Sequence, residues 1–322
     1  MNTKRLVSVT LALMFICITA QAQFSNKLNN AVRNAAENAA IRQAEKRTEK
    51  AVNEAIDNAF DKSEAERAKG EAEAEKALNK AAEQIEEAQK AQEEADAQAA
   101  NLLGAIPEVG DTPYMPSEGE YVFFPMKKGN VQVFATKDAK GKITGQTRNT
   151  IKEITGAPNA FAVHYQSEVL DAKGNPNNKD NPIVFNFRVV VKDGFMYVDM
   201  KEMFGALDGL EGLQVSGTAV KIPNNLAVGQ TLDNAAAQVR IGIINCSAVV
   251  TEGKCVAIED VTVANNTFRC HKVSQKVNAT VMGIKNESTT ISWYAKGVGS
   301  VKTETYDKNG NLVSVQELIS NS

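Results

Sequence analysis

The chain has little of the material from which catalytic and metal sites are built. It holds two histidines in 322 residues, and no pair of histidines or cysteines stands at the spacing of zinc ligands. His164 and His271 lie in separate apolar runs, where we expect strand residues satisfied by local hydrogen bonds. Cys270 precedes His271, but neighbours on a strand point to opposite faces, which is the wrong geometry for proton transfer. The sequence therefore predicts no enzyme, no catalytic or metal site and no cofactor.

Cysteine is also scarce, and the three cysteines beyond the first segment are Cys246, Cys255 and Cys270. In an oxidising compartment three cysteines allow one bridge and three different pairings. With a turn centred on Asn265-Asn266, Cys270 lies opposite Val261 and not opposite Cys255. We therefore expect buried free thiols.

The first 22 residues have the composition of a signal peptide. Lys4 and Arg5 precede an apolar run from Leu6 to Thr19, and Ala20-Gln21-Ala22 forms a small-x-small cleavage site. A retained membrane anchor is the alternative, but this run is shorter than the roughly twenty residues that span a bilayer. The residue before Cys17 is isoleucine, which does not fit a lipoprotein signal. We expect cleavage after Ala22, no remaining transmembrane segment, and a periplasmic or outer-membrane-associated protein.

Residues 23–103 lack proline and contain one glycine, Gly70. Alanine, glutamate, lysine, glutamine and arginine dominate, and these residues favour helices. Apolar residues recur at spacings of three and four, as at Val52, Ile56 and Phe60, which predicts an amphipathic helical arm with a narrow stripe for self-association. Gly70 allows two alternatives: one long helix, or a helical hairpin or coiled coil that breaks at this residue.

Charge within the arm is unevenly distributed. Residues 24–50 hold six basic and three acidic side chains, whereas residues 51–103 hold six and fourteen. This uneven charge has two explanations. The helix surface is simply exposed to solvent, or the arm pairs with itself in antiparallel fashion or with an envelope protein. No cluster of lysine and arginine is interleaved with aromatics, so we expect no nucleic-acid partner.

Beyond the arm the pattern changes from helix to strand. Residues 104–119 include three prolines and predict a linker, and residues 120–322 predict an antiparallel β-domain. Ile183, Phe185, Phe187, Val189 and Val191 alternate with other residues, as in a strand with one face in a core. Four turns begin with aspartate and end with glycine, at 138–141, 171–174, 193–194 and 307–310.

We expect ten to twelve strands and one helical turn at 201–207. The predicted fold class is α+β in separate parts, with the strands in a curved sheet, half-barrel or barrel.

Aromatic residues make up only 6% of the chain, yet many of them fall in these strands. As core residues they require no ligand. In an incompletely closed barrel, the same side chains would line an apolar pocket for a lipid or peptide. The candidate ligand or partner surface comprises Tyr121, Phe123, Phe134, Phe185, Phe187, Tyr197 and Trp293, and Phe124 and Phe195 lie beside it in the sequence.

Four segments in order carry a resemblance to a known family. They are YVFFPMKKG at 121–129, LAVGQTL at 226–232, VTVANNTFRCHKV at 261–273, and WYAKGVGSVKTETYDKNGNL at 293–312. Together they resemble the TapB-like family of exported envelope proteins, a domain of unknown function, over about residues 118–320. The family's usual proline-alanine-glycine turn is here Ala264-Asn265-Asn266. The resemblance implies a curved all-β domain similar to periplasmic lipoprotein-carrier folds, with no established enzymatic activity. The arm resembles, in composition, helical segments of outer-membrane-associated proteins.

These observations favour an exported, non-catalytic envelope protein that acts in binding, docking or assembly. The alternative is a periplasmic carrier that holds a lipid or other hydrophobic ligand in a half-open barrel. An enzyme would require His164 or His271 to meet acidic side chains in space.

Overall fold

The computed structural model describes residues 90, 93–94, 106–117, 123–176, 182–199, 202, 213–241, 244–281 and 284–322. The signal peptide, Val52, Ile56, Phe60 and Gly70 of the arm, Tyr121, and most of the helical turn expected at 201–207 lie outside these residues. Lys90, Glu93 and Glu94 are helical, and the Glu94 carboxylate lies 3.2 Å from the Lys285 ammonium group. Within the described residues, no helix is long and apolar enough to cross a membrane.

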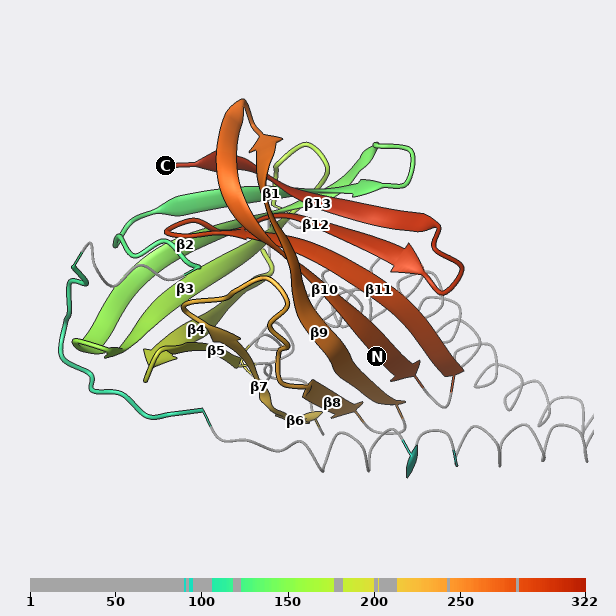
Figure 1. The fold of residues 1–322 in the computed structure, drawn as a ribbon, viewed down its shortest axis with the longest axis horizontal. Helices are drawn as coiled ribbons and strands as arrows, with labels where there is room; N and C mark the ends of the chain where they lie inside the picture. Colours follow the sequence, from blue (N-terminus) through green and yellow to red (C-terminus); the bar gives the residue numbers. More distant parts are fainter. Residues whose placement is uncertain are drawn as a thin grey trace, which may run out of the picture.

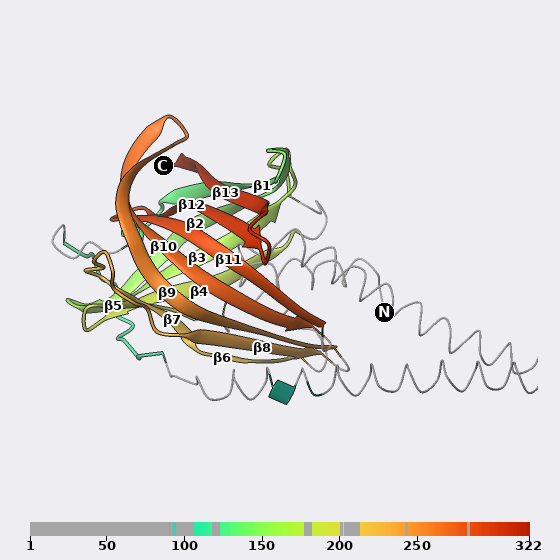
Figure 2. The ribbon, with the colours of Figure 1, turned by 45° about the vertical axis from the view of Figure 1, so that its right-hand side comes forward.

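Thirteen antiparallel strands form one sheet that curls into a nearly closed barrel (Figures 1 and 2). The expected antiparallel fold is therefore confirmed, with more strands than the ten to twelve expected. The strand order is β6-β8-β9-β10-β11-β12-β13-β1-β2-β3-β4-β5-β7. The strands are β1 (Val131–Asp138), β2 (Ile143–Ala157), β3 (Ala160–Leu170), β4 (Val184–Lys192), β5 (Phe195–Asp199), β6 (Leu213–Gly217), β7 (Ala219–Pro223), β8 (Ala235–Ile241), β9 (Ile244–Val263), β10 (Asn266–Val281), β11 (Ile284–Ala295), β12 (Gly299–Asp307) and β13 (Leu312–Asn321).

The aspartate-glycine turns join neighbouring strands as the sequence predicts. Asp138 Oδ1 accepts hydrogen bonds from the backbone N–H groups of Lys140 and Lys142, both at 2.9 Å. Gly141 then takes a φ of 80°, a left-handed conformation that glycine adopts without strain. The turns at 171–174 and 307–310 repeat this geometry, and the turn at 193–194 has positive φ at both residues.

The two ends of the strand order are joined by a single segment of chain. β6 and β7 follow one another with only Thr218 between them; β6 pairs with β8, and β7 pairs with β5. At the switch, Thr218 N–H donates to the Ala236 carbonyl and Ala236 N–H donates to Thr218 Oγ1, both at 2.8 Å. Gly217 allows this close approach, because an added Cβ would lie 2.8 Å from the Ala236 oxygen. The division of this segment into two short strands also raises the strand count.

The hairpin of β9 and β10 extends beyond the end of the barrel. β9 has 20 residues, which span roughly 65 Å when extended. Register shifts between β9 and β10, at Lys272/Val273 and Ser274/Lys276, mark bulges, which bend the ribbon and increase its twist. The first of them leaves Val256 of β9 without a partner on β10. The tip of the hairpin therefore rises above the sheet and curls over it (Figures 1 and 2).

Part of the expected linker lies along the barrel. The described residues 106–117 run beside β2, where Tyr114 N–H donates to the Ile154 carbonyl at 2.9 Å and Gly156 N–H donates to the Thr112 carbonyl at 2.8 Å. The Tyr114 ring also packs 5.6 Å from the Phe161 ring. These contacts fix the start of the β-domain to the end of β2.

Candidate functional site

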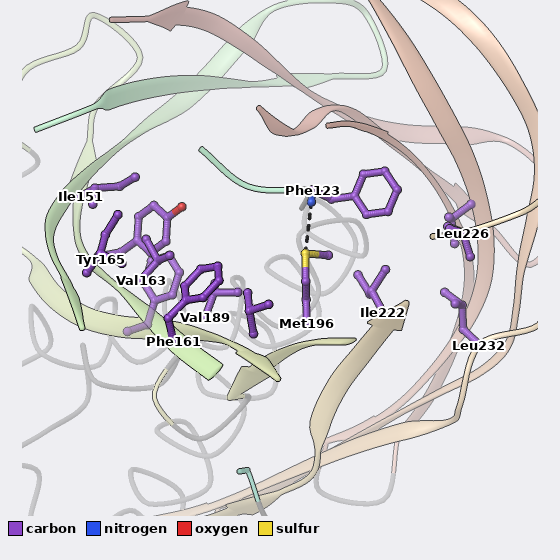
Figure 3. Packing of buried hydrophobic residues seen from close by; sticks show 14 of the residues in the cluster. Phe123, Ile151, Phe161, Val163, Tyr165, Val189, Met196, Ile222, Leu226 and Leu232 are labelled. Atoms are coloured by element: carbon purple, nitrogen blue, oxygen red, sulfur yellow. Dashed lines mark hydrogen bonds between the residues drawn. The ribbon is translucent and has the colours of Figure 1, made fainter. Parts of the chain in front are cut away.

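The barrel encloses a large apolar cluster, which Figure 3 shows from close by. β3 and β4 together supply nearly half of its buried members, because alternate residues of each strand point inward. The Tyr165 and Phe187 rings stack at 4.8 Å with an angle of 5° between their planes. The buried members are Phe123, Ile151, Ile154, Phe161, Val163, Tyr165, Val169, Phe185, Phe187, Val189, Val191, Met196, Ile222, Leu226, Leu232, Cys255 and Val273.

Phe123 enters this cluster from a segment that precedes the first strand. Its side chain is fully buried inside the barrel, and its backbone N–H donates to the Met196 sulfur at 3.2 Å (Figure 3). A thioether sulfur is a weak acceptor, so the segment is held mainly by packing. The Phe123 ring lies edge-on to the His271 ring at 4.9 Å and to the Tyr294 ring at 6.2 Å. The protein thus fills the middle of its own barrel.

The inner face of β11, β12 and β13 is polar. Alternation places Ser288, Thr290 and Ser292 on the same face as Tyr294, which packs against the apolar cluster. Ser292 Oγ lies 3.0 Å from Thr303 Oγ1 on the neighbouring strand. We call this set the hydroxyl wall; it comprises the buried residues Ser288, Thr290, Ser292, Thr303, Thr305, Ser314 and Gln316.

In the described part of the chain, two buried hydroxyl groups inside the barrel have no hydrogen-bond partner. They are Tyr165 Oη and Thr305 Oγ1, on residues that are 3% and 1% exposed. Figure 3 shows the Tyr165 oxygen pointing into the interior. Burial raises the pKa of Tyr165, so the group stays a neutral phenol. Unpaired buried hydroxyls are costly, and a polar ligand group could satisfy them.

The aromatic residues expected to share one surface are divided among three places. Phe123, Phe185 and Phe187 belong to the main cluster, with Phe124 packed against it. Phe134 and Trp293 belong to a second cluster around the tip of the β9–β10 hairpin. Phe195 and Tyr197 lie together on β5, where the Lys221 ammonium group sits 4.0 Å above the Phe195 ring. The second cluster comprises Val263, Cys270, Trp293, Ala295, Val301 and Leu318, with Phe134, Val261, Phe268, Ile291 and Val298 packed against it.

Trp293 lies at the centre of a charged row that crosses neighbouring strands. Its Nε1–H donates to Glu259 at 2.7 Å, and the ammonium groups of Lys272 and Lys302 each lie 5.1 Å from the ring. Lys272 also pairs with Glu259 at 3.2 Å, and Lys302 pairs with Glu304 at 2.7 Å. The charges compensate one another and hold the indole in place, so this arrangement stabilises the sheet.

The histidines and cysteines do not form a reactive cluster. His164 Nε2 lies 3.0 Å from Thr155 Oγ1, as a locally satisfied strand histidine should. His271 meets that expectation only in part: its ring has a backbone hydrogen bond with Tyr294, but its buried Nδ1 has no hydrogen-bond partner within the described residues. Burial lowers the pKa of His271 and raises that of Cys270 to about 11, so both groups are uncharged at neutral pH. Within the described residues, no group of three or more histidine, cysteine or acidic side chains could hold a metal ion.

All three described cysteines are buried and free, as expected. The register expected for Cys270 was wrong: it lies opposite Glu259, and Val261 lies opposite Phe268. The cause is the turn, which consists of Ala264 and Asn265, both at positive φ, instead of Asn265 and Asn266. Cys255 lies opposite Val273, so it does not meet Cys270.

Comparison with known proteins places the chain in a family. The DUF3108-like family matches residues 127–318. The chain belongs to the DUF3108-like family. A protein of Bacteroides fragilis, inferred to be exported and described as having a YmcC-like fold, matches with 19% identity and a TM-score of 0.53. A protein of Parabacteroides distasonis, inferred to be a lipoprotein, matches with 21% identity and a TM-score of 0.54. Each match covers 63% of this chain and 99% of the other. These likenesses concern the fold, and no curated protein matches.

Sequence reasoning missed the hydroxyl wall. Its signal was serine or threonine at every second position, at 288, 290 and 292 and at 303 and 305, although Thr289 obscures the pattern in the first stretch. Such alternation marks one face of a strand, but an exposed face usually carries it. The burial of these hydroxyls follows from closure of the barrel, which the local pattern does not encode.

Proposed function

We propose that this DUF3108-like protein is exported and acts without catalysis in the cell envelope, in binding, docking or assembly. The signal-peptide pattern of residues 1–22 supports export. The narrower resemblance to the TapB-like family, and the descriptions of the two structural neighbours as exported protein and lipoprotein, point to the same compartment. We place the protein in the periplasm or in association with the outer membrane.

The filled interior of the barrel is the observation that carries this proposal. Phe123 and Met196 occupy the middle of the main cluster, and both are fully buried. Because the protein's own side chains occupy the interior of the barrel, the outer surface is where we expect it to bind a partner. Among the described strands, the β9–β10 hairpin extends furthest beyond the sheet (Figure 1).

The arm would attach the β-domain to an envelope partner, or it would join copies of the chain. An alanine-rich stripe buries little area per contact, so it gains stability by pairing along its length. Replacing Val52, Ile56 and Phe60 together with glutamate should lower the helix content, and the mass in solution if pairing is between chains. Circular dichroism and light scattering measure both. An unchanged helix content and mass would leave the arm as a spacer.

A carrier of a hydrophobic ligand is the second candidate, and the unpaired hydroxyls favour it. Tyr165 Oη and Thr305 Oγ1 lie inside the barrel without partners, on an apolar wall and a polar wall respectively. A ligand with an apolar chain and an uncharged polar group would match both walls. Such a ligand would have to displace Phe123.

Affinity capture of the mature protein from its own envelope fraction tests the two candidates against each other. Co-purified proteins with no stoichiometric lipid would support docking, whereas about one lipid per chain without a protein would support the carrier. Replacing His164 and His271 with glutamine should leave the captured molecules unchanged, because we assign neither a catalytic role. Loss of function in either folded variant would contradict the non-catalytic proposal.

A further inference from the structure

One edge of the projecting hairpin is open. Between Ala257 and Val263, β9 pairs with β10 on one side, and within the described residues no other strand pairs with this stretch. The two-residue turn at Ala264 and Asn265 makes Val263 and Asn266 the hydrogen-bonded pair that closes the hairpin. Backbone groups then alternate in direction along the strand, so the N–H and C=O groups of 258, 260 and 262 point away from β10.

The same edge already accepts an extended segment a few residues earlier. Cys255 N–H donates to the Gln230 carbonyl at 2.9 Å, and Gly229 N–H donates to the Cys255 carbonyl at 2.8 Å. Leu232 N–H donates to the Gly253 carbonyl at 2.8 Å. Residues 229–232 thus act as a short added strand, and the open stretch continues directly from it.

The open edge carries few of the features that normally prevent pairing with another chain. Proteins usually protect edges with proline, several charges or cover. Here the stretch has no proline, and its outward positions are Ile258, Asp260 and Thr262, two of which are β-branched. Asp260 is exposed and pairs with Arg269 at 3.2 Å. The bulge beside Val256 twists the strand but leaves seven residues beyond it in regular pairing with β10.

We propose that the open edge of β9, from Ala257 to Val263, binds an extended segment of a partner protein as an added strand. The inference rests on the proposed docking function and names the mode of docking. Main-chain hydrogen bonds to 258, 260 and 262 supply the affinity. The segment carries β-branched residues and a lysine or arginine opposite Asp260. Two copies of this chain paired in register would instead place one Asp260 against the other, which is unfavourable.

Val228 and Val256 extend this surface at its lower end. They are 57% and 43% exposed, and each adjoins a residue of the Gly229–Cys255 hydrogen bond. An apolar side chain near the end of the bound segment can cover them. The site therefore combines a hydrogen-bonding edge, the carboxylate of Asp260 at an outward position and an apolar end.

Hydrogen exchange and amide NMR shifts of the full chain test the proposal with a defined probe. The probe is a short blocked peptide of alternating valine and lysine, and the control peptide has glutamate in place of lysine. The amides of 258, 260 and 262 should exchange fast in the free protein and become protected when the probe binds. The control peptide should bind more weakly, because its carboxylates face Asp260.

Two matched variants separate the backbone from the side chain. Asp260→Pro removes an outward N–H but no hydrogen bond to β10, so the hairpin should survive, with the amides of Val261 and Val263 still protected. It should weaken probe binding by about tenfold or more, since a hydrogen bond and the strand geometry are lost. Asp260→Asn keeps the N–H and should weaken binding less.

The outcomes are distinct. Protection confined to 258, 260 and 262 in the unmodified chain would support strand addition even if the proline variant failed to fold. Probe binding without protection there, or no binding, would overturn it. Protection that depends on protein concentration alone would show a second copy to be the occupant and would overturn the partner stated here. A captured envelope protein that still binds the folded Asp260→Pro variant would refute strand addition and leave the docking function standing.

Discussion

Replacing Tyr165 with phenylalanine should stabilise the β-domain. The Tyr165 ring is buried and stacked on Phe187, so phenylalanine can keep the packing. The hydroxyl has no partner, and leaving such a group buried costs about 1–3 kcal/mol. We therefore expect the free energy of unfolding to rise by about 1–2 kcal/mol and the Tm by roughly 2–6 °C.

Urea unfolding followed by tryptophan fluorescence measures this change. Trp293 is the only tryptophan of the chain, so its emission reports on the β-domain. The m-value should stay constant, because the surface exposed on unfolding is unchanged.

Tyr294→Phe is the matched control. Tyr294 is also desolvated, but its hydroxyl forms a hydrogen bond with Ser292. Loss of that bond should lower the free energy of unfolding by about 0.5–1.5 kcal/mol. If Tyr165→Phe left stability unchanged or lowered it, the hydroxyl would have a partner, and the unpaired-hydroxyl argument for a bound ligand would be refuted.

Three further predictions concern other parts of the β-domain. The hydrogen bond from Trp293 and the ammonium of a nearby lysine hold the pKa of Glu259 below its usual range, so its stabilising contribution is present at neutral pH and lost as the pH falls through that lowered pKa. Trp293 emission should therefore shift only below the usual glutamate range, and in Glu259→Gln the acid shift should vanish. Gly156→Ala should destabilise by more than about 3 kcal/mol in thermal unfolding, because φ is 128° and the new Cβ would lie 2.4 Å from the Ala160 oxygen; a loss under about 1 kcal/mol would show that the backbone yields. Ala264→Gly should raise stability by about 0.5–1 kcal/mol, since Ala264 has a φ of 47°, and an unchanged Tm would contradict this.

The turns and the alternating strands could be predicted from the sequence, because their signals are local. Asp138 and Gly141 belong to one turn, and the inward residues of β4 follow from a period of two. The position of Trp293 could not be predicted in this way. Alternation says that Trp293 and Tyr294 face opposite sides, but not that the curled hairpin tip covers the side of Trp293.

Long-range geometry decided the remaining features. At Thr218 the chain passes from one end of the sheet to the other, and hydrogen bonds with Ala236 hold it there. Nothing in the sequence between Thr218 and Ala236 indicates this contact. The register of Cys270 depended on which two residues form the hairpin turn. Moving the turn by one residue, from Asn265-Asn266 to Ala264-Asn265, changes the residue opposite Cys270 from Val261 to Glu259. The hydroxyl wall became visible only once β11 and β12 were paired.

Photo-crosslinking in living cells tests the docking function most directly. A photo-reactive side chain is introduced in place of Thr262, on the open edge of β9, and separately in place of Phe123, inside the barrel. We expect a protein adduct from position 262 and no lipid adduct from position 123. A lipid adduct from position 123, with no protein adduct from position 262, would contradict the docking function and establish the barrel as a carrier.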